Sequence, residues 1–367
     1  MATMEIQPSE PASVLVEMVK AAAAPKKKLF RRLVPDRSQN IRLTIQIAFI
    51  LLNIVLGVQF YRFVRFYENG GIGQGFSRPA GVEGYLPIAG LMNLKAALLT
   101  GEIPKLHPAG MFLIVCFLVV SFVFRKTFCS WLCPVGTLSE YLWKLGRKLL
   151  RRNLYLPRKL DIGLRGLKYL LLGFFLWAVY SMSPRDIHAF LESPYGLIAD
   201  VKMLNFFRFL GETGLIVVGV LMLLSMVIQN FWCRYLCPYG ALMGLAALFS
   251  PLKITRNTET CIDCAKCAKA CPSQLPVDRL ITIKSAECTG CLECVAVCPA
   301  DKTLVFATPK KKAVPAWAVA AGIAGIFFGT VGYAKVAGRW NSDIPSQVYQ
   351  RLIPHAEEAT HPMPGHE

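Results

Sequence analysis

The sequence has few acidic residues and few charged residues of either sign. Only 17% of the 367 residues are charged, with 23 Asp and Glu against 41 Lys and Arg, whereas 54% are hydrophobic. Such a composition argues against an ordinary soluble protein. A nucleic-acid-binding protein can be this basic, but it would not carry long apolar runs, so no nucleic-acid partner is expected. An integral membrane protein accounts for both features, because its cytoplasmic loops collect Lys and Arg.

Histidine is also scarce, and none of the five histidines lies within a long apolar run. Haem held between spanning helices would require paired axial ligands there, so an intramembrane haem is not expected. No removable signal peptide is evident, because the basic stretch 26–32 lies well inside the chain and no cleavage site follows the first apolar run. We expect that run to remain as a signal anchor.

Five apolar runs approach the length of about 20 residues that crosses a bilayer. They cover residues 43–61, 109–124, 167–182, 213–231 and 314–334. The sequence therefore predicts an α-helical integral membrane protein with four core spans and a fifth that is richer in small residues.

The distribution of basic residues predicts the orientation of these spans. With a cytoplasmic N-terminus, 30 of the 41 Lys and Arg fall on the cytoplasmic side, including the cluster 147–152 in a short loop. The expected location is the bacterial inner membrane, in a multi-pass arrangement. The predicted organisation is a cytoplasmic basic tail (1–40), a four-helix membrane domain (41–256), a small cytoplasmic domain (257–306), a fifth helix (307–336) and an extracytoplasmic tail (337–367).

Eight of the 13 cysteines fall in two short runs, 261–272 and 288–299. Each run reads Cys-x-x-Cys-x-x-Cys-x-x-x-Cys-Pro, which is the spacing of bacterial two-cluster ferredoxins. Three thiolates on one tight loop reach three iron atoms of a cluster, and the fourth ligand comes from the other run. The predicted ligands are Cys261, Cys264, Cys267 and Cys298 for one [4Fe–4S] cluster, and Cys288, Cys291, Cys294 and Cys271 for the other. We therefore expect residues 257–306 to form a small α+β ferredoxin domain.

Four further cysteines form a repeat. Cys129 and Cys133 end the second apolar run, Cys233 and Cys237 end the fourth, and both pairs read Cys-x-x-x-Cys-Pro at an offset of 104 residues. Two units that enter the membrane in the same direction imply a pseudo-two-fold axis along the membrane normal. On a helix, each pair would place its thiols on one face, one turn apart. The four thiols could hold a third cluster or another metal, act as redox thiols, or simply pack the helix ends.

Other polar residues and thiols have weaker signals. Cys116 lies within a run and is expected to be an inert buried residue. A quinol site at the outer membrane edge could use His107, Arg185, Asp186, His188 and Glu192, although ordinary loop residues are an equal alternative. The tail contains His355, His361, Met363 and His366, which could bind a metal or remain solvated.

Paired Cys-x-x-x-Cys-Pro motifs followed by a two-cluster ferredoxin module resemble the NapH/NosR/CcoG group of membrane polyferredoxins, over residues 41–306. The resemblance implies an iron–sulfur protein that relays electrons between the quinone pool, or a cytoplasmic donor, and a respiratory redox partner, with quinol oxidation as a candidate activity. An alternative is a metal-handling factor that reduces a metal ion during assembly of an enzyme such as a terminal oxidase. The chain has no room for the large flavin-bearing domain of NosR or the C-terminal domain of CcoG.

Overall fold

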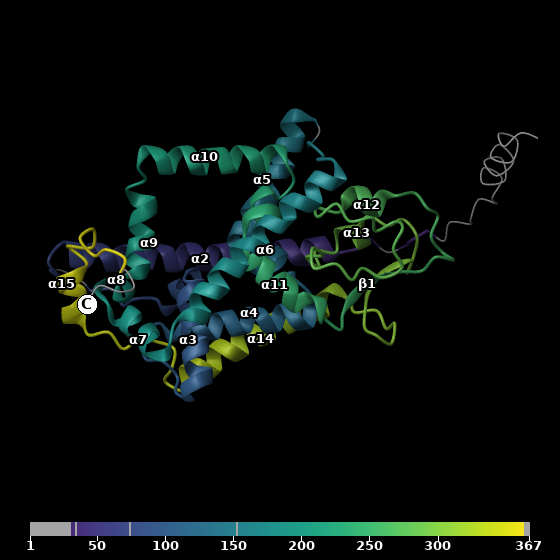
Figure 1. Ribbon diagram of the computed structural model, residues 1–367. Helices are drawn as coiled ribbons and strands as arrows, with labels where there is room; N and C mark the ends of the chain where they lie inside the picture. Colours follow the sequence, from purple (N-terminus) through teal and green to yellow (C-terminus); the bar gives the residue numbers. More distant parts are fainter. Residues whose placement is uncertain (1–30, 34, 73–74, 152, 363–367) are drawn as a thin grey trace, which may run out of the picture.

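The computed structural model describes residues 31–33, 35–72, 75–151 and 153–362, so the predicted basic tail lies almost wholly outside the described residues. The fold is mainly helical (Figure 1). Its helices are α2 (Ser38–Glu68), α3 (Pro87–Thr100), α4 (Pro108–Phe124), α5 (Pro134–Leu150), α6 (Arg158–Ser181), α7 (Pro184–Glu192), α8 (Pro194–Leu197), α9 (Ala199–Arg208), α10 (Glu212–Val227), α11 (Pro238–Leu248), α12 (Lys266–Ala270), α13 (Glu293–Ala296), α14 (Ala316–Val336) and α15 (Ser346–Leu352). Shorter turns are η1 (Ala80–Tyr85), η2 (Phe128–Leu132) and η3 (Trp232–Leu236), and the two strands are β1 (Lys253–Arg256) and β2 (Leu304–Ala307).

Three helices are long and apolar enough to cross a membrane, namely α2, α6 and α14. The pair α9 and α10 would add a fourth span if it is counted as one span, although it is bent by 82°. The predicted run 109–124 corresponds to α4, which is apolar but only 17 residues long. The chain is thus a membrane protein with three to four spans by these criteria, and the five-span count stays a prediction.

Helix packing follows the 104-residue repeat. The helix α2 packs on the turn η2 of the first unit, and α6 packs on the turn η3 of the second. The units also exchange partners, because α4 packs on α11 while α10 packs on α5. A Cβ on Gly146 of α5 would lie 1.9 Å from the carbonyl oxygen of Met226, so only glycine permits this approach. The two units therefore interlock.

The ferredoxin domain lies at one end of the helices, and α7, α8 and α15 lie at the opposite end (Figure 1). Its strands pair antiparallel, with Lys253 opposite Ala307 and Arg256 opposite Leu304. The strand β1 begins four residues before the predicted boundary at residue 257. Apolar side chains of this domain share one buried core with those of α4 and η2, including Ile254, Leu304 and Phe117. The ferredoxin domain is thus packed directly on the membrane domain.

Direct hydrogen bonds join the turn η2 to the loop between Cys288 and Cys291. The fully buried Trp131 donates its indole N–H to the carbonyl oxygen of Gly290 at 3.2 Å. The hydroxyl of Ser130 donates to the carbonyl oxygen of Thr289 at 2.7 Å. These bonds fix the first cysteine motif against a predicted cluster loop.

Gly290 is required by this contact. Its φ of 61° lies in the left-handed region, and an added Cβ would lie 2.7 Å from Cγ2 of Thr127. We expect Gly290→Ala to destabilise the protein by about 1–3 kcal/mol through overpacking, measured as a lower thermal midpoint of unfolding. The control is Gly163→Ala in α6, where an added Cβ meets nothing within 4 Å. Equal midpoints for the two variants would contradict the close docking.

Candidate iron–sulfur sites and membrane cavity

The structure gathers the eight ferredoxin cysteines into two groups of four. One small cavity is lined by Cys261, Cys264, Cys267 and Cys298. A second is lined by Cys271, Cys288, Cys291 and Cys294. Each group combines three cysteines of one run with the last cysteine of the other run, as the predicted ligand sets require.

The backbone around these cavities suits a bound cluster. In each cysteine run, two residues have a left-handed backbone conformation with positive φ. They are Asp263 and Ala265 in the first run, and Gly290 and Leu292 in the second. Such alternation turns successive N–H groups toward one concavity, which favours an anionic group. Burial raises the pKa of the Cys271 thiol to about 11, so a free thiolate there would be costly. Iron would supply the compensating positive charge.

The paired membrane motifs have a different local geometry from the one expected. Phe128–Leu132 and Trp232–Leu236 form single π-helical turns, and the second cysteine of each motif has extended backbone and caps the next helix. The predicted α-helical face with two thiols one turn apart is therefore wrong. The prolines after the motifs begin α5 and α11, as expected for proline at a first helical position. Each capping thiol accepts a backbone N–H, from Gly136 to Cys133 at 3.4 Å and from Gly240 to Cys237 at 3.2 Å.

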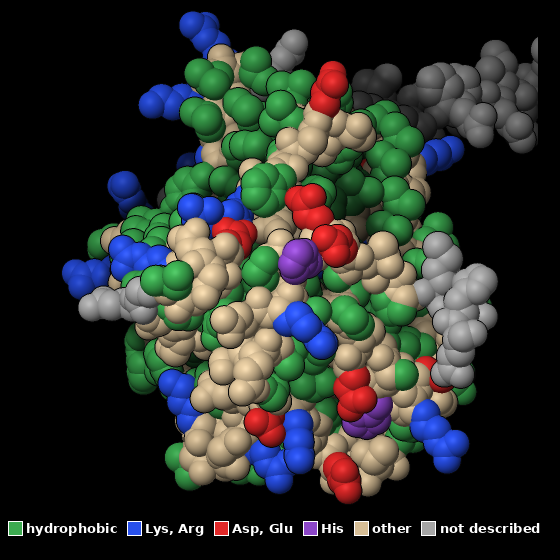
Figure 2. Space-filling view, turned by 90° about the vertical axis from the view of Figure 1, so that its left-hand side faces the viewer, with side chains coloured by type: hydrophobic (Ala, Val, Ile, Leu, Met, Phe, Trp, Pro, Cys, Tyr) green, Lys and Arg blue, Asp and Glu red, His purple; other side chains and the backbone are tan. Residues whose placement is uncertain are grey.

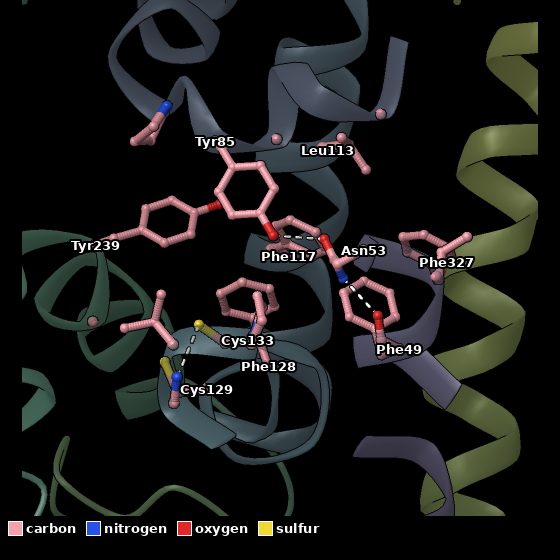
Figure 3. A pocket seen from close by; sticks show the side chains of 18 of the residues that line it. Phe49, Asn53, Tyr85, Leu113, Phe117, Phe128, Cys129, Cys133, Tyr239 and Phe327 are labelled. Carbon is pink, nitrogen blue, oxygen red and sulfur yellow. Dashed lines mark hydrogen bonds between the residues drawn. The ribbon is translucent and has the colours of Figure 1, made fainter. Parts of the chain in front are cut away.

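One cavity of about 1040 Å³ brings the two motifs together. All four cysteines, Cys129, Cys133, Cys233 and Cys237, line it. Figure 3 shows Cys129 and Cys133 on one side of the cavity, below the rings of Phe117 and Phe128. We call these four residues the four-cysteine site. Backbone N–H donors to sulfur and convergence of four thiols on one space fit a thiolate-bound cluster.

The remainder of the cavity is mostly apolar and aromatic. Its walls include Phe49, Leu113, Phe117, Phe128 and Phe327, contributed by α2, α4, η2 and α14. Polar side chains interrupt these walls, and those of Asn53, Tyr85 and Tyr239 lie among the aromatic residues. The hydroxyl of Tyr85 donates to Oδ1 of Asn53 at 2.7 Å (Figure 3). Burial, followed by nearby Cys133, raises the pKa of Tyr85 to about 12, so its hydroxyl keeps the proton and remains a donor.

The two predicted clusters differ in their distance from the membrane. Cys291 lines the same large cavity as the four-cysteine site, together with Pro272, Ser273 and Thr289 beside it. The group with Cys271, Cys288, Cys291 and Cys294 is therefore proximal to the membrane domain. The other group includes Cys264, which is exposed to solvent, and is distal.

A buried ion cluster lies toward the other end of the molecule. Arg78 bonds to Glu83 at 2.7 Å and to Asp200 at 2.8 Å, and Nδ1 of His107 lies 3.4 Å from Glu83. Burial opposes the charge of the imidazole, but the hydrogen bond and charge of Glu83 outweigh it and raise the pKa of His107. These buried ion pairs hold the segment with Arg78 and Glu83 against His107 and Asp200.

The residues predicted for an outer quinol site do not come together. His107 is buried with Glu83 and Arg78, whereas Arg185, Asp186, His188 and Glu192 are exposed on α7. The carboxylate of Asp186 accepts the N–H of Ser183 in a capping box. Figure 2 shows the end of the molecule opposite the ferredoxin domain, with charged and polar groups spread over it.

The remaining predicted residues have ordinary surroundings. Cys116 is buried in the helix α4, as expected. In the tail, His355 contacts Glu358, and His361 packs on Phe190 and Tyr195. Met363 and His366 lie outside the described residues. Across the described ranges, no three His, Cys, Asp or Glu side chains are placed to hold a single metal ion.

Sequence reasoning missed Asn53, Tyr85, Tyr239 and the buried Lys126, all of which line the cavity. A lone Tyr or Asn carries no motif, and these residues meet only through tertiary packing. Lys126 had a signal that could have been used, since it lies three residues before Cys129 at a polar position of the repeat.

Comparison with known proteins supports the iron–sulfur interpretation. A family model described as a 4Fe-4S binding domain matches twice, at residues 106–153 and 210–257, and a 4Fe-4S dicluster domain matches residues 253–299. The two matches to the first model start 104 residues apart, which is the offset of the cysteine repeat. The chain thus carries two or more [4Fe–4S] clusters.

Similar proteins point to electron transport. YccM of Escherichia coli (strain K12), whose name describes a candidate electron transport protein, is 51% identical over 88% of this chain and 90% of its own length. The regulatory protein NosR of Pseudomonas aeruginosa is 31% identical over 41% of this chain and 20% of its own. The methylamine utilization ferredoxin-type protein MauN of Paracoccus denitrificans is 32% identical over 40% of this chain and 48% of its own. No solved structure matches.

Proposed function

Because the chain belongs to the family of membrane ferredoxin-type electron transport proteins that includes YccM, we propose that it relays electrons between a lipid-soluble quinol and a soluble redox partner. The relay would run from the membrane cavity through the four-cysteine site to the proximal and then the distal ferredoxin site. The bound clusters would serve as one-electron carriers. The chain's own side chains bind the quinol, hold the sites in contact and exclude water.

One observation carries this proposal. The cavity that contains the four thiols also reaches Cys291 of the proximal ferredoxin site. Trp131 and Ser130, which lie between the two cysteines of the first motif, bond directly to the loop of Cys288 and Cys291. On the second motif, Arg234 bonds to Gln274, three residues after Cys271. Both membrane motifs thus touch the proximal site rather than the distal one.

The cavity walls favour a quinol as the membrane-side reactant. They are largely aromatic, and several wall residues are exposed on the outside of the helices, including Leu52, Tyr85 and Phe328. In a membrane these residues face lipid, so a lipid-soluble molecule can enter sideways. Among the aromatic walls, Asn53 and Tyr85 could supply polar contacts that orient a ring with oxygen substituents. A quinol gives up two electrons, which two one-electron carriers accept in turn, and two protons, which are released to water.

The proposed orientation follows the basic residues. The ferredoxin domain would be cytoplasmic, and α7, α8 and α15 would lie on the extracytoplasmic side. Because Cys264 is exposed, the distal site would lie at the surface of the ferredoxin domain, where a cytoplasmic redox partner could approach. Labelling of single cysteines added near residue 310 and near residue 345 in sealed spheroplasts tests this. Labelling only near residue 345 is expected, and labelling only near residue 310 would reverse the orientation.

The proposal is tested with purified protein. A reduced, water-dispersible quinol analogue is added anaerobically, and the reduced clusters are followed by electron paramagnetic resonance. Signals from reduced [4Fe–4S] clusters are expected to appear with the quinol and to be absent with its methyl ether, which cannot be oxidised in the same way. Clusters that dithionite reduces but no quinol reduces would contradict the quinol as the electron donor.

A single hydroxyl tests the cavity. We expect Tyr85→Phe to weaken quinol binding by about 5–10-fold, the value of one lost hydrogen bond, with the maximal rate of cluster reduction little changed. The measurement is the quinol concentration that gives half the maximal reduction rate. The control is Tyr155→Phe, because Tyr155 is 58% exposed and does not line the cavity. An unchanged half-saturation for Tyr85→Phe would place the quinol elsewhere.

A further inference from the structure

The buried cation Lys126 faces the four-cysteine site. Lys126 lies between α4 and η2, is only 3% exposed and lines the same cavity as the four thiols. Its carbonyl oxygen accepts the backbone N–H of Cys129 at 3.2 Å, which ties it to the first motif. An added Cβ on Gly240 would lie 3.5 Å from Nζ of Lys126 and 3.6 Å from Sγ of Cys237. The side-chain ammonium of Lys126 and the thiol of Cys237 therefore both lie beside Gly240.

The charge of Lys126 is offset only in part, because one carboxylate, that of Glu287, is shared between Lys126 and Lys168. The nearby carboxylate of Glu287 is already held by Nζ of Lys168, at 2.7 and 2.6 Å to its two oxygens. Within the described ranges, Lys126 has no hydrogen bond from its side chain and no ion pair. Lysine is ordinarily charged at neutral pH, and an anionic cluster beside it would favour that charged form. A surplus positive charge is thus directed at the thiols.

The repeat shows that this charge is not needed for the fold of a motif. The position equivalent to Lys126 in the second unit, 104 residues on, is Asn230. Asn230 also lines the cavity, and its Oδ1 accepts from the hydroxyl of Ser139 at 3.3 Å. At this position the first unit thus presents a cation and the second a neutral amide, while the cavity-lining Arg234 of the second unit is neutralised by Asp161 at 2.7 Å.

The negative charge of a bound cluster gives a reason for a cation beside the four-cysteine site. A [4Fe–4S] group bound by four thiolates is an anion, and its reduction adds one further negative charge. Net charge and nearby charged groups are among the factors that set cluster reduction potentials. The electrostatic effect of a buried ammonium is stronger than in water, because the dielectric constant around it is lower. A positive charge beside the site therefore favours its reduced form.

We propose that Lys126 is a positioning residue that raises the reduction potential of the group bound at the four-cysteine site, so that this site accepts an electron from the membrane cavity. The proposal rests on the proposed function, because it requires a cluster at these thiols. Among the described residues, it also gives the first unit a cation without an ion pair beside the site, whereas the cavity-lining Arg234 of the second unit is paired with Asp161 at 2.7 Å.

The chain supplies matched variants for the test. Lys126→Asn places the residue of the second unit in the first, Asn230→Lys does the reverse, and Lys126→Arg keeps the charge. Potentiometric titration with dithionite and ferricyanide, followed by electron paramagnetic resonance, gives the midpoint of each cluster signal. Iron per chain is measured on the same samples.

In Lys126→Asn, the reduced-to-oxidised ratio of the four-cysteine signal at a fixed potential should fall at least tenfold, a shift of about 59 mV to lower potential. Lys126→Arg should remain close to wild type, and Asn230→Lys should shift the same signal upward. The ferredoxin midpoints should move less, which provides an internal control.

The outcomes separate the two proposals. About 12 iron atoms per chain with an unchanged midpoint in both Lys126→Asn and Asn230→Lys overturns the role of Lys126 and leaves the relay intact. About 8 iron atoms in the unaltered protein, the content of two clusters, overturns the four-cysteine cluster itself. If the Lys126→Asn variant loses iron, the test rests on the midpoint potential of the four-cysteine signal in Asn230→Lys. A midpoint that is lower than in the unaltered protein, or unchanged, overturns the inference.

Discussion

Replacing Cys129 and Cys233 by serine is expected to lower the iron content from about 12 to about 8 atoms per chain. The two residues line the cavity from opposite repeat units, so the double variant removes one thiolate from each half of the four-cysteine site. The two ferredoxin sites use other cysteines and should keep their iron. Colorimetric iron and acid-labile sulfide assays on purified protein measure the change.

The matched control is Cys116→Ser. Cys116 is buried within α4 and lies outside all three cysteine-lined cavities, so its loss should leave iron at about 12 atoms. Membrane insertion of each variant is checked by its resistance to carbonate extraction. An unchanged iron content in a correctly inserted Cys129→Ser, Cys233→Ser variant would show that these thiols hold no cluster.

Removal of Arg42 is expected to have the largest effect on stability. Arg42 is 3% exposed, and its guanidinium makes two bonds of 2.7 Å to Glu140 of α5 and one of 2.8 Å to Glu293 of the ferredoxin domain. Arg42→Ala would leave both carboxylates near each other without their main cation. Loss of one partner of a buried ion pair costs about 3–5 kcal/mol, seen here as a lower midpoint of unfolding and faster proteolysis of residues 253–307.

Two comparisons make this result specific. Arg65→Ala in the same helix removes an ion pair with Glu68 in which Arg65 is 49% exposed, and should cost no more than about 1 kcal/mol. Replacing Glu140 by Gln together with Arg42→Met should restore part of the lost stability, since it removes a buried charge along with its partner. Equal midpoints for Arg42→Ala and Arg65→Ala would show that Arg42 does not hold the domains together.

The sequence alone suffices to propose the two ferredoxin groups, because ligation chemistry limits cysteine spacing. Cys271 and Cys298 each end one run, and the structure places each beside the opposite run. Covalent spacing and the geometry of a four-iron cluster carry this information locally. The repeat is predictable for a similar reason, since Cys129 and Cys233 share both spacing and flanking proline.

Features that depend on tertiary packing could not be predicted in this way. The π-helical turns follow the ends of α4 and α10, and Cys133 and Cys237 take extended backbone to cap the next helices. Nothing in a Cys-x-x-x-Cys spacing distinguishes this turn from an α-helix. Likewise, the bond between Tyr85 and Asn53 joins residues 32 positions apart, which no periodicity reveals.

Hydropathy leaves open whether α4 is one of the spans. The run 109–124 is strongly apolar because α4 is buried among α3, α11 and α14. Apolar residues are required equally by lipid and by a protein core, so composition alone does not separate the two environments. His107 likewise looked like an interfacial residue, whereas its partners Glu83 and Arg78 lie on a segment more than 20 positions away.

The most direct test of the relay is quinol-driven reduction of the ferredoxin clusters in the Cys129→Ser, Cys233→Ser variant. Rapid-freeze electron paramagnetic resonance follows the two ferredoxin signals after a reduced quinol is mixed with oxidised protein in lipid vesicles. The unaltered protein should reduce both clusters, whereas the variant, with both clusters present and reducible by dithionite, should not respond to quinol. Equal rates in the two proteins would contradict a relay through the four-cysteine site.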